Sequence, residues 1–336
     1  MKSGWRGLAG FLLSGALLWW VLRDVSPAAV WTELSRADPW LFFWATVAAT
    51  VIFPIRALRW RVILEPVAPD IPFGPLWRAT AIGMMINNVL PARAGEFARA
   101  YALTREVPRV PFSTSIASLV VDRLFDAVVL LCLGLVALMD PAFPSDATIA
   151  GQPLADWARG GIAVTVALLA GVYLLVFFPR ALIAIFEIFS RKISPKLEER
   201  GKIALQRFSD GLSVMRSPRR FALVFGWTVV HWLVSAVGTW LGFLAVGIRL
   251  PFSAALFVQT VTAFGVALPS APGFFGVFEA IAVITLAVYG VSAALATSWA
   301  IGFHILTFIP ITIIGAIYFV RLGLHFRDLR SAPDQR

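Results

Sequence analysis

The sequence predicts an all-α, polytopic transmembrane helical protein with two inverted repeats, each containing a broken, re-entrant helical hairpin. Three observations predict this fold class: an apolar composition, apolar runs of spanning length, and two Pro/Gly-rich interruptions at a constant spacing. Hydrophobic residues make up 59% of the 336 positions and charged residues 14%, whereas soluble domains carry about 25% charged residues. Most of the surface is therefore expected to face lipid.

Apolar runs of about 20 residues predict membrane-spanning helices. These runs cover residues 5–22, 40–60, 111–139, 158–178, 219–246 and 292–320. The first run follows Lys2 and Arg6 as a signal peptide would, but Trp19 and Trp20 stand where a cleavage site needs small residues. We therefore expect a retained first helix and a single transmembrane domain over residues 1–336.

Two further apolar stretches, 75–104 and 251–288, are interrupted by Pro and Gly. Residues 88–96 read Asn-Val-Leu-Pro-Ala-Arg-Ala-Gly-Glu, and residues 267–276 read Ala-Leu-Pro-Ser-Ala-Pro-Gly-Phe-Phe-Gly. Pro removes a backbone donor and Gly tolerates a left-handed backbone, so each stretch is expected to form two short helices around a loop. At membrane depth such a backbone persists only where protein or water satisfies it.

A spacing of 178 residues relates the two interruptions, because Pro91 and Gly95 map onto Pro269 and Gly273. The same spacing brings the flanking apolar runs into register. A shared spacing over two spans and an interruption indicates an internal repeat. The predicted repeats cover about 40–139 and about 218–317.

The distribution of basic residues orients the helices. Residues 180–220 carry ten Lys and Arg, whereas residues 140–156 carry none. Because Lys and Arg collect in cytoplasmic loops, both termini are expected in the cytoplasm and the two repeats are antiparallel. The basic segment at about 180–217 is expected to lie as an amphipathic linker on anionic inner-leaflet lipids. Inverted repeats with broken helices are typical of secondary transporters.

Three charged residues, Asp122, Arg123 and Asp126, interrupt the apolar run at 111–139. A charge inside a span costs about 2.5–3.5 kcal/mol and marks a candidate functional site. Asp122 and Asp126 are four residues apart and share one helix face. Two interpretations remain open: the helix begins in the cytoplasm with these charges at the interface, or the charges face an internal cavity. Apolar residues also precede the cluster, which favours the cavity.

The first interruption holds Asn87, Asn88, Arg93 and Glu96. A guanidinium at a helix N-terminus favours an anion such as phosphate. The alternative is an internal Arg93–Glu96 pair that holds the hairpin shut, and the two are compatible. Glu279 is the acid of the second interrupted stretch, and its cost at that depth favours a pairing or functional role.

Arg56 and Arg59, beside Trp60, are interpreted as interfacial anchors, with headgroup contact as the less favoured alternative. His304 lies 178 residues after Asp126, and a helix–helix contact is the simpler interpretation for it. The sequence has no phosphate-binding loop, nucleophile elbow or Cys/His metal spacing, so we expect no catalytic residue, metal or cofactor. The basic residues border apolar spans, which argues against nucleic-acid binding.

Four segments carry a family resemblance. They read Arg-Ala-Leu-Arg-Trp at 56–60, Asn-Asn-Val-Leu-Pro-Ala-Arg-Ala-Gly-Glu at 87–96, Val-Asp-Arg-Leu-Phe-Asp at 121–126 and Pro-Gly-Phe-Phe-Gly-Val-Phe-Glu at 272–279. In this order they resemble the membrane domain of the lysylphosphatidylglycerol synthase/flippase family, over about residues 5–325. The resemblance implies a flippase-like fold without the C-terminal synthase domain of some members. The family's usual Gly-Gly is absent before the second acid, which implies a changed cavity or lipid.

We therefore expect a non-enzymatic lipid flippase of the inner (cytoplasmic) membrane, with both termini cytoplasmic. Its substrate would be a phospholipid, glycolipid, polyprenyl phosphate or hopanoid, and a homo-oligomer is compatible with the sequence. The alternatives are an intramembrane enzyme with a carboxylate as general base, or a non-catalytic partner of a separately encoded lipid-synthesis enzyme. The expected headgroup cavity comprises Asn87, Asn88, Arg93, Glu96, Asp122, Arg123, Asp126 and Glu279, with Arg56, Arg59 and His304 as accessory residues.

Overall fold

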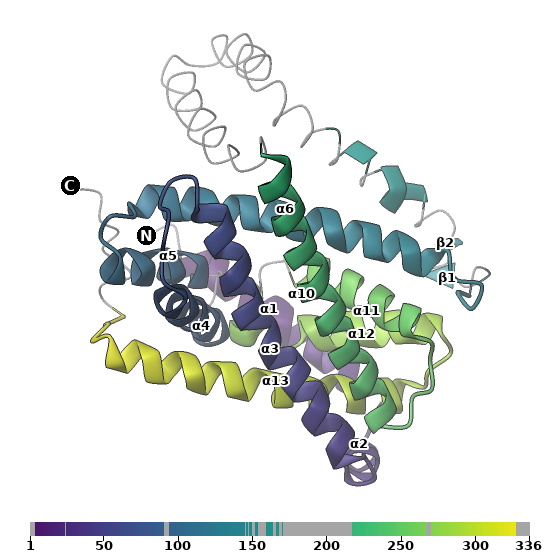
Figure 1. Cartoon of the computed structure of the whole chain (residues 1–336). Coiled ribbons are helices and arrows are strands. Elements are labelled where there is room, and N and C mark those ends of the chain that lie inside the picture. The colour runs from purple at the N-terminus through teal and green to yellow at the C-terminus, as the bar shows by residue number, and fades with distance from the viewer. Residues whose placement is uncertain are drawn as a thin grey trace, which may run out of the picture.

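The computed structural model describes most of the chain as packed helices (Figure 1). The described residues are 4–23, 25–90, 94–144, 217–266 and 270–326, with short pieces between 146 and 170. One of these pieces is a two-stranded hairpin, β1 (Thr148–Ile149) with β2 (Gln152–Pro153).

Within the described residues, three helices are long and apolar enough to cross a membrane: α3 (Pro39–Leu64), α10 (Pro218–Ala245) and α13 (Ala293–Arg321). Each begins at a residue whose side chain accepts a backbone N–H of the first turn, Asp38, Ser217 and Ser292 respectively. Two further helices, α1 (Gly4–Leu22) and α6 (Phe112–Leu138), fall on predicted spans, and a short α2 (Pro27–Ser35) lies between α1 and α3. The predicted span at 158–178 and the linker at 180–217 lie almost wholly outside the described residues.

The first interrupted stretch forms two helices, α4 (Phe73–Val89) and α5 (Gly95–Glu106). They pack antiparallel and very closely. The backbones are so near one another that a Cβ on Gly95 would collide with the carbonyl oxygen of Gly83. The Asn87 side chain accepts a hydrogen bond from the Gly95 amide at 2.8 Å, which closes the pair where α5 begins. The 12 residues of α5 rise about 18 Å, too short for a hydrocarbon core of about 30 Å.

The second interrupted stretch forms α11 (Phe252–Gly265), a 3₁₀ turn η2 (Pro272–Phe274) and α12 (Val277–Val288). Gly273 and Gly276 adopt positive φ angles of 66° and 85°, as the sequence pattern predicts for this turn. Phe274 also adopts a positive φ, 64°, a conformation that disfavours residues with a Cβ. The turn packs on α1, where Ser14 Oγ accepts a hydrogen bond from the Ala271 amide at 2.8 Å.

The centre of the fold is the pair formed by α3 and α10, which run side by side in opposite directions (Figure 1). Contacts extend from an ion pair between Glu65 and Arg220 at one end to a backbone hydrogen bond between Asp38 and Ala245 at the other. Around this pair, α6 packs against α11 and α13 packs against α4. The apolar core is divided accordingly, with one buried cluster centred on α3, α4 and α5 and another on α10, α12 and α13.

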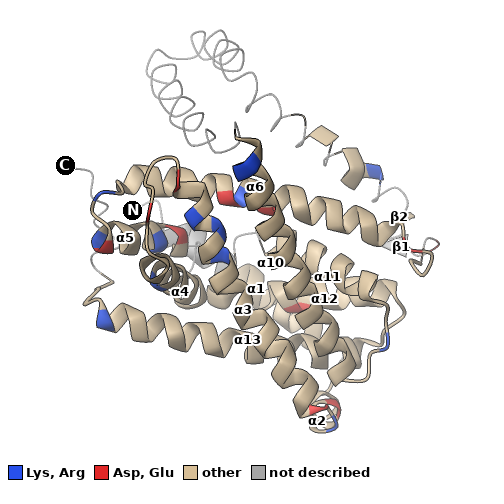
Figure 2. Ribbon diagram, in the orientation of Figure 1, with Lys and Arg blue, Asp and Glu red and all other residues tan. Residues whose placement is uncertain are grey.

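Large aromatic side chains are exposed near the chain's beginning. Trp19, Trp31, Trp40, Phe43 and Trp44 are each more than half exposed. Exposed Trp is enriched at membrane–water boundaries, whereas a soluble surface rarely exposes so many large apolar groups together. Charged residues, in contrast, gather inside the fold where α3, α5 and α6 meet (Figure 2). Buried charged residues in an apolar helical protein commonly belong to a functional site.

Candidate functional site

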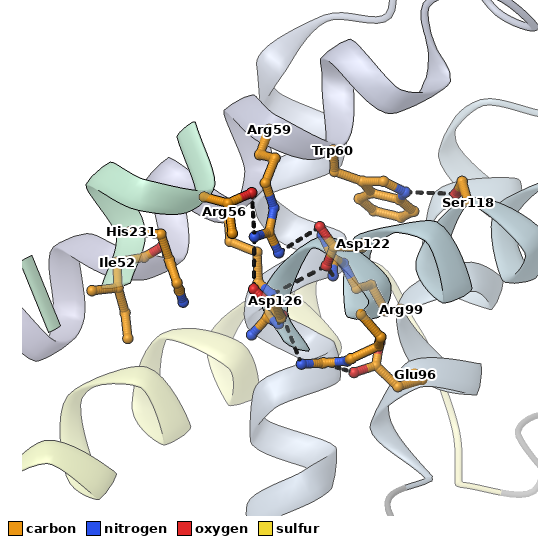
Figure 3. Close-up of polar contacts among 12 residues, drawn as sticks. Ile52, Arg56, Arg59, Trp60, Glu96, Arg99, Ser118, Asp122, Asp126 and His231 are labelled. Atoms are coloured by element: carbon orange, nitrogen blue, oxygen red, sulfur yellow. Dashed lines mark hydrogen bonds and ion pairs between the residues drawn. The ribbon is translucent and has the colours of Figure 1, made fainter. Parts of the chain in front are cut away.

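Seven charged side chains from three helices converge inside the first half of the protein (Figure 3). We call this group the charge cluster. Two arginines come from α3, two members from α5 and three from α6. Spacings of three or four residues place the two members from α3, and the two from α5, on one helix face and bring Asp126 beside both Asp122 and Arg123 on α6. The members of the charge cluster are Arg56, Arg59, Glu96, Arg99, Asp122, Arg123 and Asp126.

Asp126 is the most heavily contacted acid of the charge cluster. Arg56 Nη2 donates to its Oδ2 at 2.6 Å and Arg59 Nη1 donates to its Oδ1 at 2.7 Å. Arg123 Nη1 adds a contact at 3.2 Å, and Trp232 Nε1 of α10 donates at 3.0 Å. With four donors the carboxylate is nearly saturated, since it has about four acceptor sites.

Asp122 is fully buried one helical turn earlier. Arg59 Nη2 lies 2.6 Å from its Oδ1, and Arg56 Nε lies 3.3 Å from its Oδ2. Arg99 Nη1 reaches the same Oδ2 at 3.2 Å. The two guanidinium groups of α3 therefore bridge both aspartates of α6, an arrangement that locks the two helices in register.

The accessible part of the charge cluster is an ion pair between Arg123 and Glu96. The Arg123 side chain is 40% accessible and that of Glu96 26%, whereas the two aspartates are almost inaccessible. Behind this pair, the Arg99 guanidinium lies 4.1 Å from the centre of the Trp60 ring, a cation–π contact. Its Nε and Nη2 have no hydrogen-bond partner in the described part of the chain.

The charge cluster holds four arginines against three carboxylates, so one positive charge is not balanced by its described members. Burying charges is costly, and opposite partners offset that cost only when geometry and hydrogen bonding are good. Here Asp126 accepts four hydrogen bonds, and Asp122 is ion-paired with three arginines. The surplus is therefore positive, and it favours an anion at the accessible end.

A cavity of about 470 Å³ adjoins the charge cluster and lies between the two halves of the chain. Arg56, Glu96, Arg123 and Asp126 form its charged end. Away from that end the lining comes mainly from α10, α11, α12 and α13 and is aromatic or neutral. These lining residues include Ser235, Thr239, Gln259, Phe274, Phe278, Trp299 and Phe303, while Trp232 lines the cavity next to Asp126.

The structure brings together Glu96, Asp122, Arg123 and Asp126. Glu96, Arg123 and Asp126 line the cavity, whereas Asp122 lies behind them. Asn87 lines the cavity as well as closing the α4–α5 pair. The two aspartates are buried in protein and not exposed at an interface.

The interpretation of Arg56 and Arg59 as interfacial anchors is wrong. They are 6% and 0% exposed and belong to the charge cluster. Both point toward α6, where two aspartates supply the partners that an anchoring arginine would find at the membrane surface. Apolar neighbours and an adjacent Trp look the same in sequence whether an arginine reaches outward or inward.

Three other predicted site residues do not face the charged end of the cavity. Asn88 donates to Thr312 Oγ1 at 2.7 Å and so ties α4 to α13. Glu279 accepts from the Gly276 amide at 2.6 Å and pairs with His304 at 2.6 Å, which links α12 to α13. His304 thus makes a helix–helix contact, its simpler interpretation. Arg93 lies outside the described residues.

The structure adds site residues that the sequence does not assign. Trp232 and Thr228 of α10 contact the charge cluster because α10 lies along α3. Gln259 of α11 lines the cavity. A pattern within one helix cannot reveal these contacts, since they depend on which helices pack together. Arg99 differs from these residues, because it lies three positions after Glu96 and the spacing alone places both on one face of α5.

Comparison with known proteins gives consistent relatives. A UPF0104 membrane protein of Methanothermobacter thermautotrophicus is 28% identical over 309 residues, 86% of each chain. A UPF0104 membrane protein of Pyrococcus horikoshii is 23% identical over 92% of this chain and 94% of its own. Glycosyltransferase AglD of Haloferax volcanii is 27% identical over 92% of this chain but only 53% of AglD, so the chain spans about half of that protein.

The family model of the lysylphosphatidylglycerol synthase transmembrane region matches residues 7–315. This range includes α3, α5 and α6, which carry the charge cluster, and every residue that lines the cavity. The chain is therefore a membrane protein that belongs to the lysylphosphatidylglycerol synthase transmembrane region family.

Proposed function

We propose that this protein is a lipid flippase, which moves a lipid with a polar headgroup between the two leaflets without chemistry of its own. The observation that carries the proposal is the charge cluster opening onto a cavity between two halves of an apolar protein. Ionisable groups inside an apolar helical protein are costly, and they commonly mark a substrate pathway.

The packing of α3 against α10 supports an inverted repeat. The Ile52 carbonyl lies 3.2 Å from His231 Nδ1, and the residue 178 positions before His231 is Phe53. Equivalent positions of the two halves therefore meet, as they must where a twofold axis passes between antiparallel copies. An axis in the membrane plane relates such copies in many transporters.

The packing around that pair follows the same rule. Gly134 of α6 lies against Thr260 of α11. Thr312 of α13, 178 positions after Gly134, accepts a hydrogen bond from Asn88 of α4. The long third helix of each half thus packs on the first hairpin helix of the other half. This exchange supports two hairpins that enter the membrane from opposite faces. The cytoplasmic placement of both termini rests on the distribution of Lys and Arg in the sequence.

In the proposed mechanism the headgroup occupies the cavity while the acyl chains stay in the bilayer. A charged headgroup would lose its hydration in hydrocarbon, a cost of several kcal/mol or more. The half-accessible Arg123 can exchange Glu96 for an anionic group of the lipid, so its positive charge keeps a partner throughout. Asp122 and Asp126 hold the remaining arginines in place during that exchange.

A second candidate rests on the relationship to glycosyltransferase AglD. In that case the chain would serve a lipid-linked glycan pathway as a membrane partner, without moving lipid itself. Purified protein alone would then fail to translocate any lipid. The two candidates therefore separate in a reconstituted system.

The test is lipid scrambling in proteoliposomes that contain purified protein and a lipid with a fluorescent headgroup, quenched from outside by a membrane-impermeant reductant. Arg123→Gln and Glu96→Gln should each slow translocation at least tenfold while insertion stays normal. The matched control is Arg78→Gln, which breaks an α4–α5 ion pair with Glu106 outside the cavity lining. Normal rates in both cluster variants, or equal slowing in the control, would refute the proposal.

A further inference from the structure

The cavity has two chemically different ends. The charged end presents Arg123 with its accessible guanidinium. The other end presents neutral hydrogen-bonding groups, namely Ser235, Thr239 and Gln259, among the rings of Trp299 and Phe303. A ligand that fills both ends has to combine an anion with a neutral, polar part.

The charged end is built to bind an anion and not a cation. Asp126 accepts four hydrogen bonds and Asp122 is ion-paired with three arginines, so neither carboxylate is left for an ammonium group. Glu96 is the remaining acid, and its partner is Arg123. A guanidinium fork matches the oxygens of phosphate well.

Gln259 marks the neutral end. Its Nε2 donates to the Trp232 carbonyl at 3.0 Å, which fixes the orientation of the side-chain amide. Its Oε1 is buried and has no hydrogen-bond partner in the described part of the chain, while the residue as a whole is 5% exposed. A buried acceptor without a partner is unfavourable unless a ligand or water supplies a donor. The fixed Oε1 therefore suits a hydroxyl group.

Aromatic rings line this end of the cavity beside the polar groups. Trp299 and Phe303 are stacked with centroids 5.2 Å apart, and Phe278 stacks on Phe303 at 6.5 Å. Sugar rings combine hydroxyl edges with apolar C–H faces, which suit a site with both kinds of surface. The volume of about 470 Å³ leaves room for one monosaccharide with its phosphate.

We infer that the substrate is a lipid whose phosphate carries a single neutral sugar, with the phosphate at Arg123 and a sugar hydroxyl donating to Gln259 Oε1. The inference rests on the proposed function and names the substrate class of the same cavity. Each end alone contributes part of the affinity. A bare lipid phosphate or a neutral glycolipid therefore binds more weakly than the combined headgroup.

Binding to the purified full-length protein in detergent tests the inference separately from transport. The probes share one short prenyl chain and carry phosphate, phosphoglucose, glucose alone or phosphoglycerol. The phosphoglucose lipid is expected to bind at least tenfold more tightly than each of the others, measured by native mass spectrometry with titration. Three outcomes would overturn the inference. The phosphate lipid or the neutral glucoside could bind as tightly as the phosphoglucose lipid, or the phosphoglycerol lipid could bind more tightly than it.

Two variants test which residue binds the phosphate and which binds the sugar. Gln259→Leu should remove the tenfold advantage of phosphoglucose and leave bare phosphate unchanged, whereas Arg123→Gln should weaken both phosphate probes. Thr285→Val, at a buried α12 residue bonded to its own helix, is the control and should change neither. If Gln259→Leu does not fold, Gln259→Met tests the same contact. A Gln259 variant that weakens both phosphate probes equally contradicts the inference.

Failure of the proposed flippase function and failure of the inferred substrate class give different results. Preferred binding of phosphoglucose without translocation would refute the proposed flippase and leave the substrate class standing. Translocation without any preference for phosphoglucose would refute the substrate class and leave the flippase standing.

Discussion

Replacing Asp126 by asparagine should destabilise the protein more than breaking any exposed ion pair. Its carboxylate contacts Arg56, Arg59 and Arg123 at 2.6, 2.7 and 3.2 Å and is nearly inaccessible. Asparagine keeps the shape but removes the charge, which leaves four arginines facing two carboxylates. Removing one partner of a buried ion pair costs about 3–5 kcal/mol, and we expect a loss of unfolding free energy of that size.

Unfolding of purified protein in detergent micelles with increasing SDS measures this loss. The matched control is Glu65→Gln, which breaks the pair with Arg220 at the end of α3. Their side chains are 50% and 37% exposed, so the expected loss is at most about 1 kcal/mol. The variants differ in burial but not in chemistry, because both replace a carboxylate by its amide.

A second substitution tests whether charge imbalance causes the loss of stability. Combining Asp126→Asn with Arg56→Gln restores the single surplus positive charge of the charge cluster. The double variant should therefore lose less free energy than the two single variants together. Additive losses, or a loss for Asp126→Asn no larger than that of Glu65→Gln, would refute the view that charge balance holds α3 and α6 together.

Three further predictions concern the backbone and the topology. Phe274→Gly should stabilise the turn by about 1–2 kcal/mol, because glycine adopts the positive φ without strain, and should loosen discrimination among headgroups; lower stability would count against this reasoning. Gly95→Ala should prevent α4 and α5 from packing and lower folded yield, whereas Gly226→Ala, with open space around it, should be neutral; equal yields would contradict it. Cysteines placed at Ser145 and Ser194, both outside the described residues, should label from opposite sides of the membrane in intact cells, and labelling from one side would reject the inverted repeat.

Composition and helix punctuation were enough to predict the long described helices and the two interrupted stretches, but not the short α2. The apolar runs that became α3, α10 and α13 are long, and their ends are set by local signals such as Asp38 and Pro39. The stretches 75–104 and 251–288 form separate helices on either side of the interruptions at 88–96 and 267–276, because Pro and Gly act on the backbone locally. That each pair of short helices enters and leaves on one membrane face stays a prediction.

The site was less accessible to sequence because its chemistry lies in pairings between helices. The spacing of Asp122 and Asp126 predicts a shared face but not the partners on that face. Those partners are Arg56 and Arg59, whose position beside Trp60 suggested the membrane surface instead. The contact of Trp232 with Asp126 depends on α10 lying along α3, over a separation of 106 residues. A tertiary contact of this kind leaves no local periodicity to detect.

Glu279 shows how the same reasoning separates a structural acid from a substrate-binding one. One carboxylate oxygen accepts the Gly276 amide and the other contacts His304, both at 2.6 Å. Glu279→Ala leaves two buried polar groups without a partner, and at about 1–3 kcal/mol for each it should cost about 2–6 kcal/mol in SDS unfolding. Glu279→Gln keeps an oxygen for the Gly276 amide and should cost less than half as much.

Transport then decides the role of the charge on Glu279. If this acid shapes the turn before α12 and does not touch the headgroup, Glu279→Gln should translocate lipid at nearly the unmodified rate. Glu279→Ala should lose activity only in proportion to its loss of folded protein. Should Glu279→Gln fold normally and yet abolish translocation, the carboxylate itself would have to take part in moving the lipid. The site would then extend from the charge cluster of the first half to the Glu279–His304 pair of the second.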